Sequence, residues 1–322
     1  PLAGAAMTPG ATRRRPPGGT ARGAAVILAM LLAALAATIA ATLFADQQRW
    51  TRAVLQRRDQ VQAQALVMAG VQWARQIVRG DGRAKQVDHL GEAWATALPP
   101  IPLENGEIRG VISDAAARLN VNVLAESGPA GAVDRERFLR LFARVGGPAD
   151  ALDAIGDWID TDDVARPEGA EGAYYASRGA PGLAANGPLA RVAELAAVRG
   201  VALPALAAAA PFLTALPAGT PVNVNTAPPE VLAAILGDAR GEVVATLLAG
   251  RAQRPYASVA DFRARLPQGA TLPSDASLAV RSDFYYVSVE ARQGTTIARA
   301  RALLRRGGPG QAWPAIVWQV VE

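Results

Sequence analysis

The hydrophobic pattern is dominated by one uncharged run near the N-terminus. Residues 24–45 read AAVILAMLLAALAATIAATLFA, 22 positions without a charged side chain. A helix needs about 20 consecutive apolar residues to cross a bilayer core. A cleaved secretory signal has a shorter apolar core. A buried helix of a soluble domain would show polar positions at helical spacing, and only Thr38 and Thr42 are polar here. The run therefore predicts a transmembrane helix over residues 24–45.

The apolar run passes into an amphipathic one without a helix-breaking residue. Neither Pro nor Gly occurs from Ala24 until Gly70. Apolar side chains recur at roughly helical spacing at Val54, Val61, Ala65, Met68, Val71 and Trp73. The pattern predicts one continuous helix from Ala24 to Val78, with its second half packed on a folded domain. Two helices with a break near Asp46 are the alternative.

The remaining chain changes from strand-like to helix-like patterns and back. Residues 107–124 read as two short strands around a turn, and residues 283–321 as a hairpin about Gln293-Gly294 followed by a last strand. Between them, helices are expected from Asp134 and in DALDAIGDWI, VAELAAVRGV, TAPPEVLAAIL with Thr226 as N-cap, GEVVATLLAGR and SVADFRARL. The pattern predicts an α+β chain, in which an all-helical insertion interrupts a sheet domain. Three successive small units are the alternative.

Composition removes several classes of function. The 322 residues include no Cys, which excludes disulfides and thiolate metal sites, and a single His, His89, which argues against a His-based triad. The sequence contains no phosphate-binding loop, nucleophile elbow or zinc motif. We therefore expect no enzyme.

Charge does not fix the orientation in the membrane. Positive residues are usually concentrated on the cytoplasmic side of a membrane helix. Here four Arg precede the apolar run and four follow it closely, so this rule does not decide the orientation. The short N-terminal side and the long C-terminal side favour a cytoplasmic tail and an exported body.

The candidate chemistry lies in the stretch DWIDTDDVARPEGAEGAYY, residues 157–175. Its carboxylates repel one another unless water or a cation relieves them, and hard oxygen ligands suit calcium. Three of them, Asp160, Asp162 and Glu171, fall at positions 1, 3 and 12 of an EF-hand loop. Val164 and Ala165 occupy positions 5 and 6, which argues against an EF-hand. A looser calcium loop and a solvated acidic loop both fit the residues.

The N-terminal region resembles a type IV prepilin, in which a basic leader ends in Gly and an apolar helix continues as an amphipathic one. The matching junction is ARG/AAVIL, which implies cleavage by a prepilin peptidase between Gly23 and Ala24. Most such proteins carry Glu at the fifth mature position, where this chain has Leu28. Lack of that Glu is typical of the protein K minor pseudopilins of type II secretion systems. A carboxylate in hydrocarbon is unfavourable unless it is paired with a group of opposite charge. A subunit at the fibre tip has no neighbour above it with which such a carboxylate could pair.

Three further blocks resemble the same protein K family, in the same order: DWIDTDD…GAE…YY, NGPLARVAELAAVRGV and PVNVNTAPPEVLAAIL. The resemblance covers nearly all of Gly23–Glu322. It implies a pilin-like antiparallel sheet with an insertion of the SAM-like or helix-hairpin-helix type. It also implies calcium, two ions in the family, with Asp160, Asp162, Asp163 and Glu171 as ligands and Glu168 and Asn223 as weaker candidates.

The implied function is that of a minor pseudopilin at the pseudopilus tip, which helps to start assembly and supports secretion across the outer membrane. The expected partners are other minor pseudopilins, the major pseudopilin and the prepilin peptidase. The chain would cross the bacterial inner membrane once, with its C-terminal body in the periplasm. The expected segments are a leader (1–23), a helix (24–80), two sheet parts (81–125 and 274–322) and the insertion between them (126–273).

A membrane-anchored DNA-binding protein is the alternative, because residues 222–266 resemble a helix-hairpin-helix unit. Such units bind the nucleic-acid backbone through amides of a Gly-x-Gly hairpin. Here Gly237 and Gly241 are too far apart, and Asp238 between them would repel phosphate. We therefore expect no nucleic acid as a partner.

Overall fold

The computed structural model describes residues 20–84, 87–96, 99–179, 185–237, 241–267, 274–307 and 313–322. The chain divides into two compact units, one up to Asp59 and one from Gln60 to Glu322. The bounds of the five segments expected from the sequence stay a prediction.

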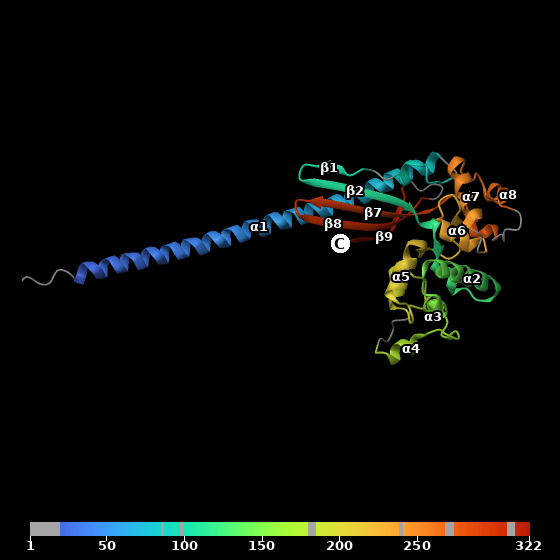
Figure 1. Cartoon of the computed structure of the whole chain (residues 1–322), viewed down its shortest axis with the longest axis horizontal. Coiled ribbons are helices and arrows are strands. Elements are labelled where there is room, and N and C mark those ends of the chain that lie inside the picture. The colour runs from blue at the N-terminus through green and yellow to red at the C-terminus, as the bar shows by residue number, and fades with distance from the viewer. Residues whose placement is uncertain are drawn as a thin grey trace, which may run out of the picture. The chain divides into compact units, whose positions relative to one another are not determined.

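A single helix, α1, runs from Thr20 to Ala84 (Figure 1). The predicted continuous helix is therefore confirmed, without a break at Asp46, and it extends beyond the expected bounds at both ends. Side chains 24–45 are exposed. The helical segment Gly23–Asp81 is long and apolar enough to cross a membrane.

The face of α1 that packs in the second unit differs from the expected one. The buried residues are Ala63, Val67, Val71, Ala74 and Val78. Of the positions expected on this face only Val71 is buried, whereas Met68 and Trp73 remain 43% and 48% exposed. This helix carries two apolar faces that share Val71. The sheet packs on the face with Ala and Val side chains, because these small side chains allow the helix and the sheet to approach closely.

An antiparallel five-stranded sheet packs against this part of α1. Its order is β1-β2-β7-β8-β9. The strands are β1 (Ile101–Leu103), β2 (Gly106–Asp114), β7 (Phe284–Gln293), β8 (Thr296–Arg305) and β9 (Ala315–Val321). Val287, Val289, Ala300 and Ala302 share a buried cluster with the α1 residues. The predicted hairpin about Gln293-Gly294 and the last strand are both confirmed, with Gly294 at φ 55° in the turn.

Two strand expectations need correction. β1 lies before the strands expected within 107–124, and its Pro102 is tolerated because β1 is an edge strand. The second strand expected within 107–124 is only Leu119–Asn120 (β3), which pairs in parallel with β4 (Leu213–Thr214) outside the large sheet.

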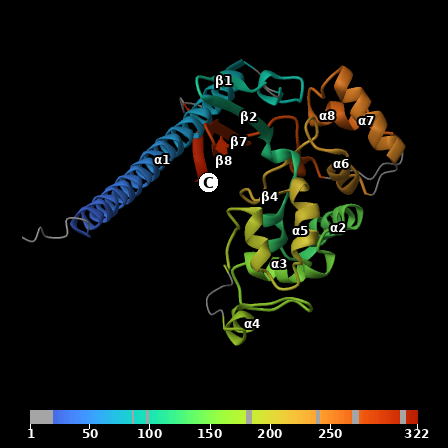
Figure 2. The same cartoon turned by 60° about the vertical axis from the view of Figure 1, so that its left-hand side comes forward.

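A mainly helical segment connects the neighbouring strands β2 and β7, and Figure 2 shows it beside the sheet. Its helices are α2 (Gly128–Val145), α3 (Leu152–Ile159), α4 (Gly172–Ser177), α5 (Leu203–Ala209), α6 (Pro229–Ile235), α7 (Gly241–Gln253) and α8 (Val259–Ala264). A short parallel pair, β5 (Val222–Asn223) and β6 (Leu278–Ala279), completes it. Its core includes Phe138, Ile155, Leu195, Leu232 and Phe262.

Three helix expectations also differ from the structure. The helix expected from Asp134 begins at Gly128, where Ser127 is the N-cap and Pro129 stands in the first turn. VAELAAVRGV forms a 3-10 helix over Val192–Ala197. Pro228, not Thr226, is the N-cap of α6. The SAM-like character of the insertion stays a prediction, and Asp238 lies outside the described residues.

The insertion begins at a buried polar junction at the end of β2. The carboxylate of Asp114 accepts hydrogen bonds from the Asn223 amide, the Thr226 hydroxyl and the Ser282 hydroxyl. The Thr226 hydroxyl points into this network, and α6 begins at Pro229, after Pro228. Arg306, directly after β8 at the same end of the sheet, donates to Asp81 and Asp88 just beyond the packed part of α1. The insertion thus starts at the sheet end where α1 ends.

Candidate metal centre

The acidic loop connects α3 to α4, and its two ends bring carboxylates together. Asp160 is the C-cap of α3 and Glu171 the N-cap of α4. Carboxylate oxygens of Asp160, Asp162 and Glu171 all lie within 4.8 Å of one another. Three of the predicted ligands therefore converge, from positions separated by up to eleven residues along the chain.

Aromatic and polar contacts hold this loop on the insertion core. The rings of Trp158 and Tyr175 meet edge to face, 5.1 Å between centroids. The buried carboxylate of Asp157 accepts from the backbone N–H of Arg166 at 3.1 Å. A Cβ on Gly156 would overlap the Arg166 guanidinium, and a Cβ on Gly169 would overlap the Asp157 carboxylate. These two glycines allow the loop to lie close against α3.

The electrostatics of the group are unfavourable for the bare carboxylates. Glu171 is 6% exposed, and neither of its carboxylate oxygens has a hydrogen-bond partner among the described residues. Burial, with the nearby charges of Asp157 and Asp160, raises the pKa of Glu171 to about 7. Burial also raises the pKa of Asp160, although its ion pair with Arg166, 3.0 Å long, opposes the shift.

The residues present fit a hard cation. Calcium takes six to eight oxygen ligands and tolerates irregular geometry. Oδ1 of Asp160 is also buried without a partner among the described residues, like both oxygens of Glu171. A buried acceptor without a donor is costly, so a cation bound here would remove that cost for three oxygens.

Asn186 is a candidate that the sequence reasoning missed. Its side-chain amide donates to Asp163 Oδ1 at 3.1 Å and to the carbonyl of Asp162 at 3.3 Å. Its own Oδ1 is buried without a partner among the described residues. The residue has φ 41°, the one positive φ of a non-Gly residue among those described. The Asn-Gly-Pro sequence at 186–188 signals such a turn, but not its contact with the acidic loop.

The other predicted site residues lie differently. Asp163 is not among the converging carboxylates, although it accepts from the Asn186 amide and its charge contributes to the raised pKa of Glu171, and Glu168 is exposed. Asn223 is not brought to the loop, since its amide donates to Asp114, Ser282 and the carbonyl of Asp88 at the sheet junction. Gly23 lies within α1 with open space around its Cα, and Ala24 is exposed.

A second acidic group, which the sequence did not reveal, lies at the end of α1. Oxygens of Asp81, Asp88 and Glu92 lie within 4.8 Å of one another. Arg306 donates to Asp88 at 2.7 and 2.9 Å and to Asp81 at 3.0 Å. Burial, followed by the charge of Glu92, raises the pKa of Asp81 to about 6. The Arg306 guanidinium already pairs with two of these three carboxylates, which makes the group an ion-pair network.

Comparison with known proteins agrees with the insertion blocks. Two family models, both described as type II secretion system protein K, match residues 117–218 and 222–281. Type II secretion system protein K of Pseudomonas aeruginosa is 30% identical over 262 residues, which cover 78% of each chain. The protein of the same name from Klebsiella pneumoniae is 32% identical over 238 residues, 68% of this chain and 72% of that one.

A solved structure supports the fold. The crystal structure of the GspK-GspI-GspJ complex from the type 2 secretion system of enterotoxigenic Escherichia coli contains a chain that matches with a TM-score of 0.70 and 24% identity. The match covers 83% of this chain and 98% of that chain. The two family models match residues of the insertion, and the relatives named here are all type II secretion system protein K. The chain therefore belongs to the type II secretion system protein K family.

Proposed function

We propose that this protein is the minor pseudopilin at the tip of the pseudopilus and helps to start its assembly. The observation that carries the proposal is the position of the insertion. It leaves the sheet at the Asp114 end of β2, the same end where Arg306 binds Asp81 in the last turn of α1 and Asp88 just after this helix. Subunits of such a fibre would stack along the direction of α1. A bulky segment at that end would leave no room for a further subunit above, so the role is structural rather than catalytic.

The membrane part of the proposal rests on α1. Its apolar section would anchor the precursor in the inner membrane, with the second unit in the periplasm. Cleavage between Gly23 and Ala24 would release a mature helix, in which Leu28 leaves the fifth position without a carboxylate. This fits a subunit whose N-terminal region has no preceding neighbour to pair with.

The expected partners are other minor pseudopilins and, below them, the major pseudopilin. The solved relative was crystallised as a GspK-GspI-GspJ complex. We propose that this chain forms a corresponding complex with the minor pseudopilins of its own system.

Calcium is proposed as the ion of the acidic loop. Asp160, Asp162 and Glu171 would hold it, with Asn186 as a further oxygen donor. The ion would supply positive charge between carboxylates that otherwise repel one another. Asp160 and Glu171 lie at the two ends of the loop, at the end of α3 and the start of α4, so the ion would hold these two ends together.

Co-expression tests the proposed position. The full chain, produced with the prepilin peptidase and the other minor pseudopilins of its system, should be recovered from detergent in one complex with a single copy of this chain. Filaments labelled by an antibody against the insertion should carry the label at an end. Label repeated along the shaft would contradict the proposal.

A further inference from the structure

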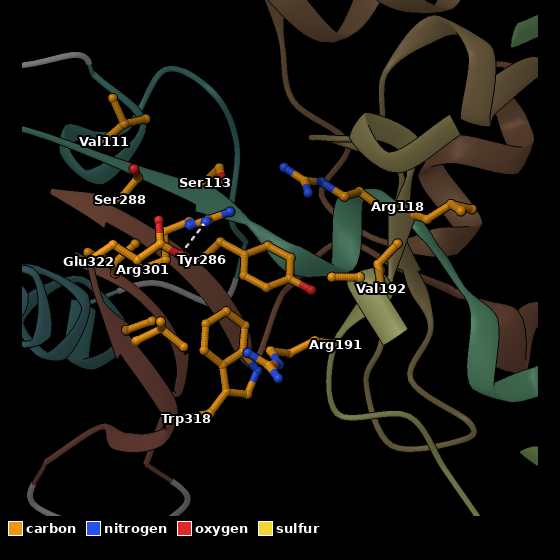
Figure 3. A pocket seen from close by; sticks show the side chains of 15 residues that line it. Val111, Ser113, Arg118, Arg191, Val192, Tyr286, Ser288, Arg301, Trp318 and Glu322 are labelled. Atoms are coloured by element: carbon orange, nitrogen blue, oxygen red, sulfur yellow. Dashed lines mark hydrogen bonds and ion pairs between the residues drawn. The ribbon is translucent and has the colours of Figure 1, made fainter. Parts of the chain in front are cut away.

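A groove of about 440 Å³ separates the sheet from the helical insertion (Figure 3). One wall is the sheet face opposite α1, with Val111, Tyr286 and Trp318. Tyr286 pairs with Leu303, and Leu303 with Trp318, so these side chains share one face of the sheet. The opposite wall comes from the insertion, with Arg118, Arg191 and Val192. None of the acidic-loop residues lines this groove.

The groove has an excess of positive charge. Among the described residues it is lined by Arg118, Arg191 and Arg301, and by one acidic residue, Glu322, which pairs with Arg301 at 2.8 Å. Arg191 lies 3.9 Å from Glu194 and keeps 49% of its side chain exposed. Arg118 lies over the Tyr286 ring at 5.0 Å and makes no ion pair or hydrogen bond with any described residue. Arg118 as a whole is half-buried, but its guanidinium nitrogens keep solvent access, so a carboxylate in the groove can reach them.

Trp318 in the wall of the groove carries a further donor. The indole Nε1–H of Trp318 is buried and has no acceptor among the described residues. Arg guanidinium groups bind carboxylates through paired hydrogen bonds, and indole N–H groups only donate. The groove thus offers unsatisfied donors beside aromatic and aliphatic surface, including Val111, which is 53% exposed.

From this geometry we propose that the groove is the docking site of an acidic peptide segment of a partner protein, with an apolar side chain next to its carboxylates. Charge complementarity selects the carboxylates, because the unpaired guanidinium and indole groups are donors without acceptors. The Tyr286 and Trp318 rings select the apolar side chain. The edge strand β9, which contributes Trp318 and Val320 to the groove, offers a backbone along which an extended segment can lie.

A peptide fits better than a phosphate polymer or a lipid headgroup. Those ligands require a row of exposed cations. Here Arg118 is partly covered and Arg301 is already paired. The inference does not rest on calcium or on a place at the fibre tip, so it can fail while both of those hold.

Fluorescence anisotropy of the full chain in non-ionic detergent tests this. The probe is a fluorescein-labelled peptide Gly-Glu-Leu-Asp-Phe-Glu-Gly, and its control has Gln and Asn in place of Glu and Asp. The acidic peptide should bind and the neutral one should not. Arg118→Gln and Arg191→Gln should each weaken binding about tenfold, the effect of losing a charge-assisted hydrogen bond. Arg57→Gln, an exposed arginine on α1, is the matched control and should bind like the wild type.

The outcomes separate clearly. Equal binding of both peptides, no binding of either, or undiminished binding by Arg191→Gln overturns the proposal. Arg191 is half exposed, so its variant gives a decision even if Arg118→Gln unfolds. A 12-nucleotide single-stranded DNA or phosphatidylglycerol vesicles that bind through the same two arginines, while the acidic peptide does not, also overturn it.

Discussion

The negative charge of Glu171 is unfavourable in the folded protein without a bound cation. Its pKa rises from an ordinary value of 4.5 to about 7 in the folded chain, mainly through burial. The folded state therefore holds this proton more tightly than the unfolded state does. By linkage, this residue makes the ion-free protein less stable as the pH rises from about 4.5 to about 7.

Glu171→Gln should therefore raise the melting temperature of the chelated protein at pH 7.5, by roughly 4–8 °C, because a buried charge is removed. The same variant should no longer respond to calcium, whereas wild type should gain stability when calcium replaces EDTA. Differential scanning fluorimetry at pH 5.5 and 7.5 measures both effects, and the calcium response of wild type should be larger at pH 7.5.

Glu168→Gln is the matched control, because Glu168 is an exposed carboxylate outside the group of converging oxygens. It should leave both the melting temperature and the calcium response nearly unchanged. A wild-type protein that melts at the same temperature in EDTA and in calcium would contradict the proposed ion.

Asp114 is the acceptor on which the sheet junction depends. Asn223, Thr226 and Ser282 all donate to its buried carboxylate. Asp114→Ala would remove the acceptor that these three donors share and would leave the Ser282 hydroxyl with no acceptor among the described residues, so we expect a loss of about 3–5 kcal/mol of unfolding free energy. Urea unfolding followed by circular dichroism measures this. Ser113→Ala, at the half-buried neighbouring position, should change it by less than about 1 kcal/mol.

The packing of α1 on the sheet depends on one close approach. A Cβ at Gly70 would lie 2.7 Å from Cγ1 of Val289 in β7, whereas nothing lies within 4 Å of a Cβ at Gly80. Gly70→Leu should separate helix from sheet and cost about 1–3 kcal/mol by overpacking. Gly80→Leu should be neutral or stabilising, because Leu favours helix over Gly. Equal melting temperatures for the two variants would refute this account of the packing.

Processing concerns the whole molecule, because it decides whether the anchor can enter a fibre. With the prepilin peptidase present, intact-mass measurement should find a mature chain that starts at Ala24. Gly23→Val should block the cut, since the peptidase would have to accept a branched side chain in place of Gly. Nothing lies within 4 Å of a Cβ at Gly23, so the substitution does not disturb packing.

The Gly23→Val protein should therefore keep the melting temperature of the unprocessed wild type while it fails to restore secretion in a strain that lacks its own protein K. A mature N-terminus other than Ala24, or secretion restored by the uncut chain, would contradict the proposed processing.

Local sequence determined the elements whose signals lie within a few residues. Residues 24–45 specify an apolar helix by length and lack of charge. Alternation about Gln293-Gly294 specifies the hairpin, and the close spacing of Asp160, Asp162 and Glu171 is enough to mark the acidic loop. These features need no distant partner, because chain geometry and solvation alone produce them.

Tertiary structure decided everything that depends on a partner far away in the chain. It determined which face of α1 packs on the sheet. It also brought Thr226 and Asn223 to donate hydrogen bonds to Asp114, which lies 112 and 109 positions away. It also placed Asn186 at the acidic loop and Arg118 over Tyr286. The hydrophobic periodicity identifies the apolar faces of a helix or strand, but it does not show which other helix or strand will pack on them. Only the packed chain supplies those contacts.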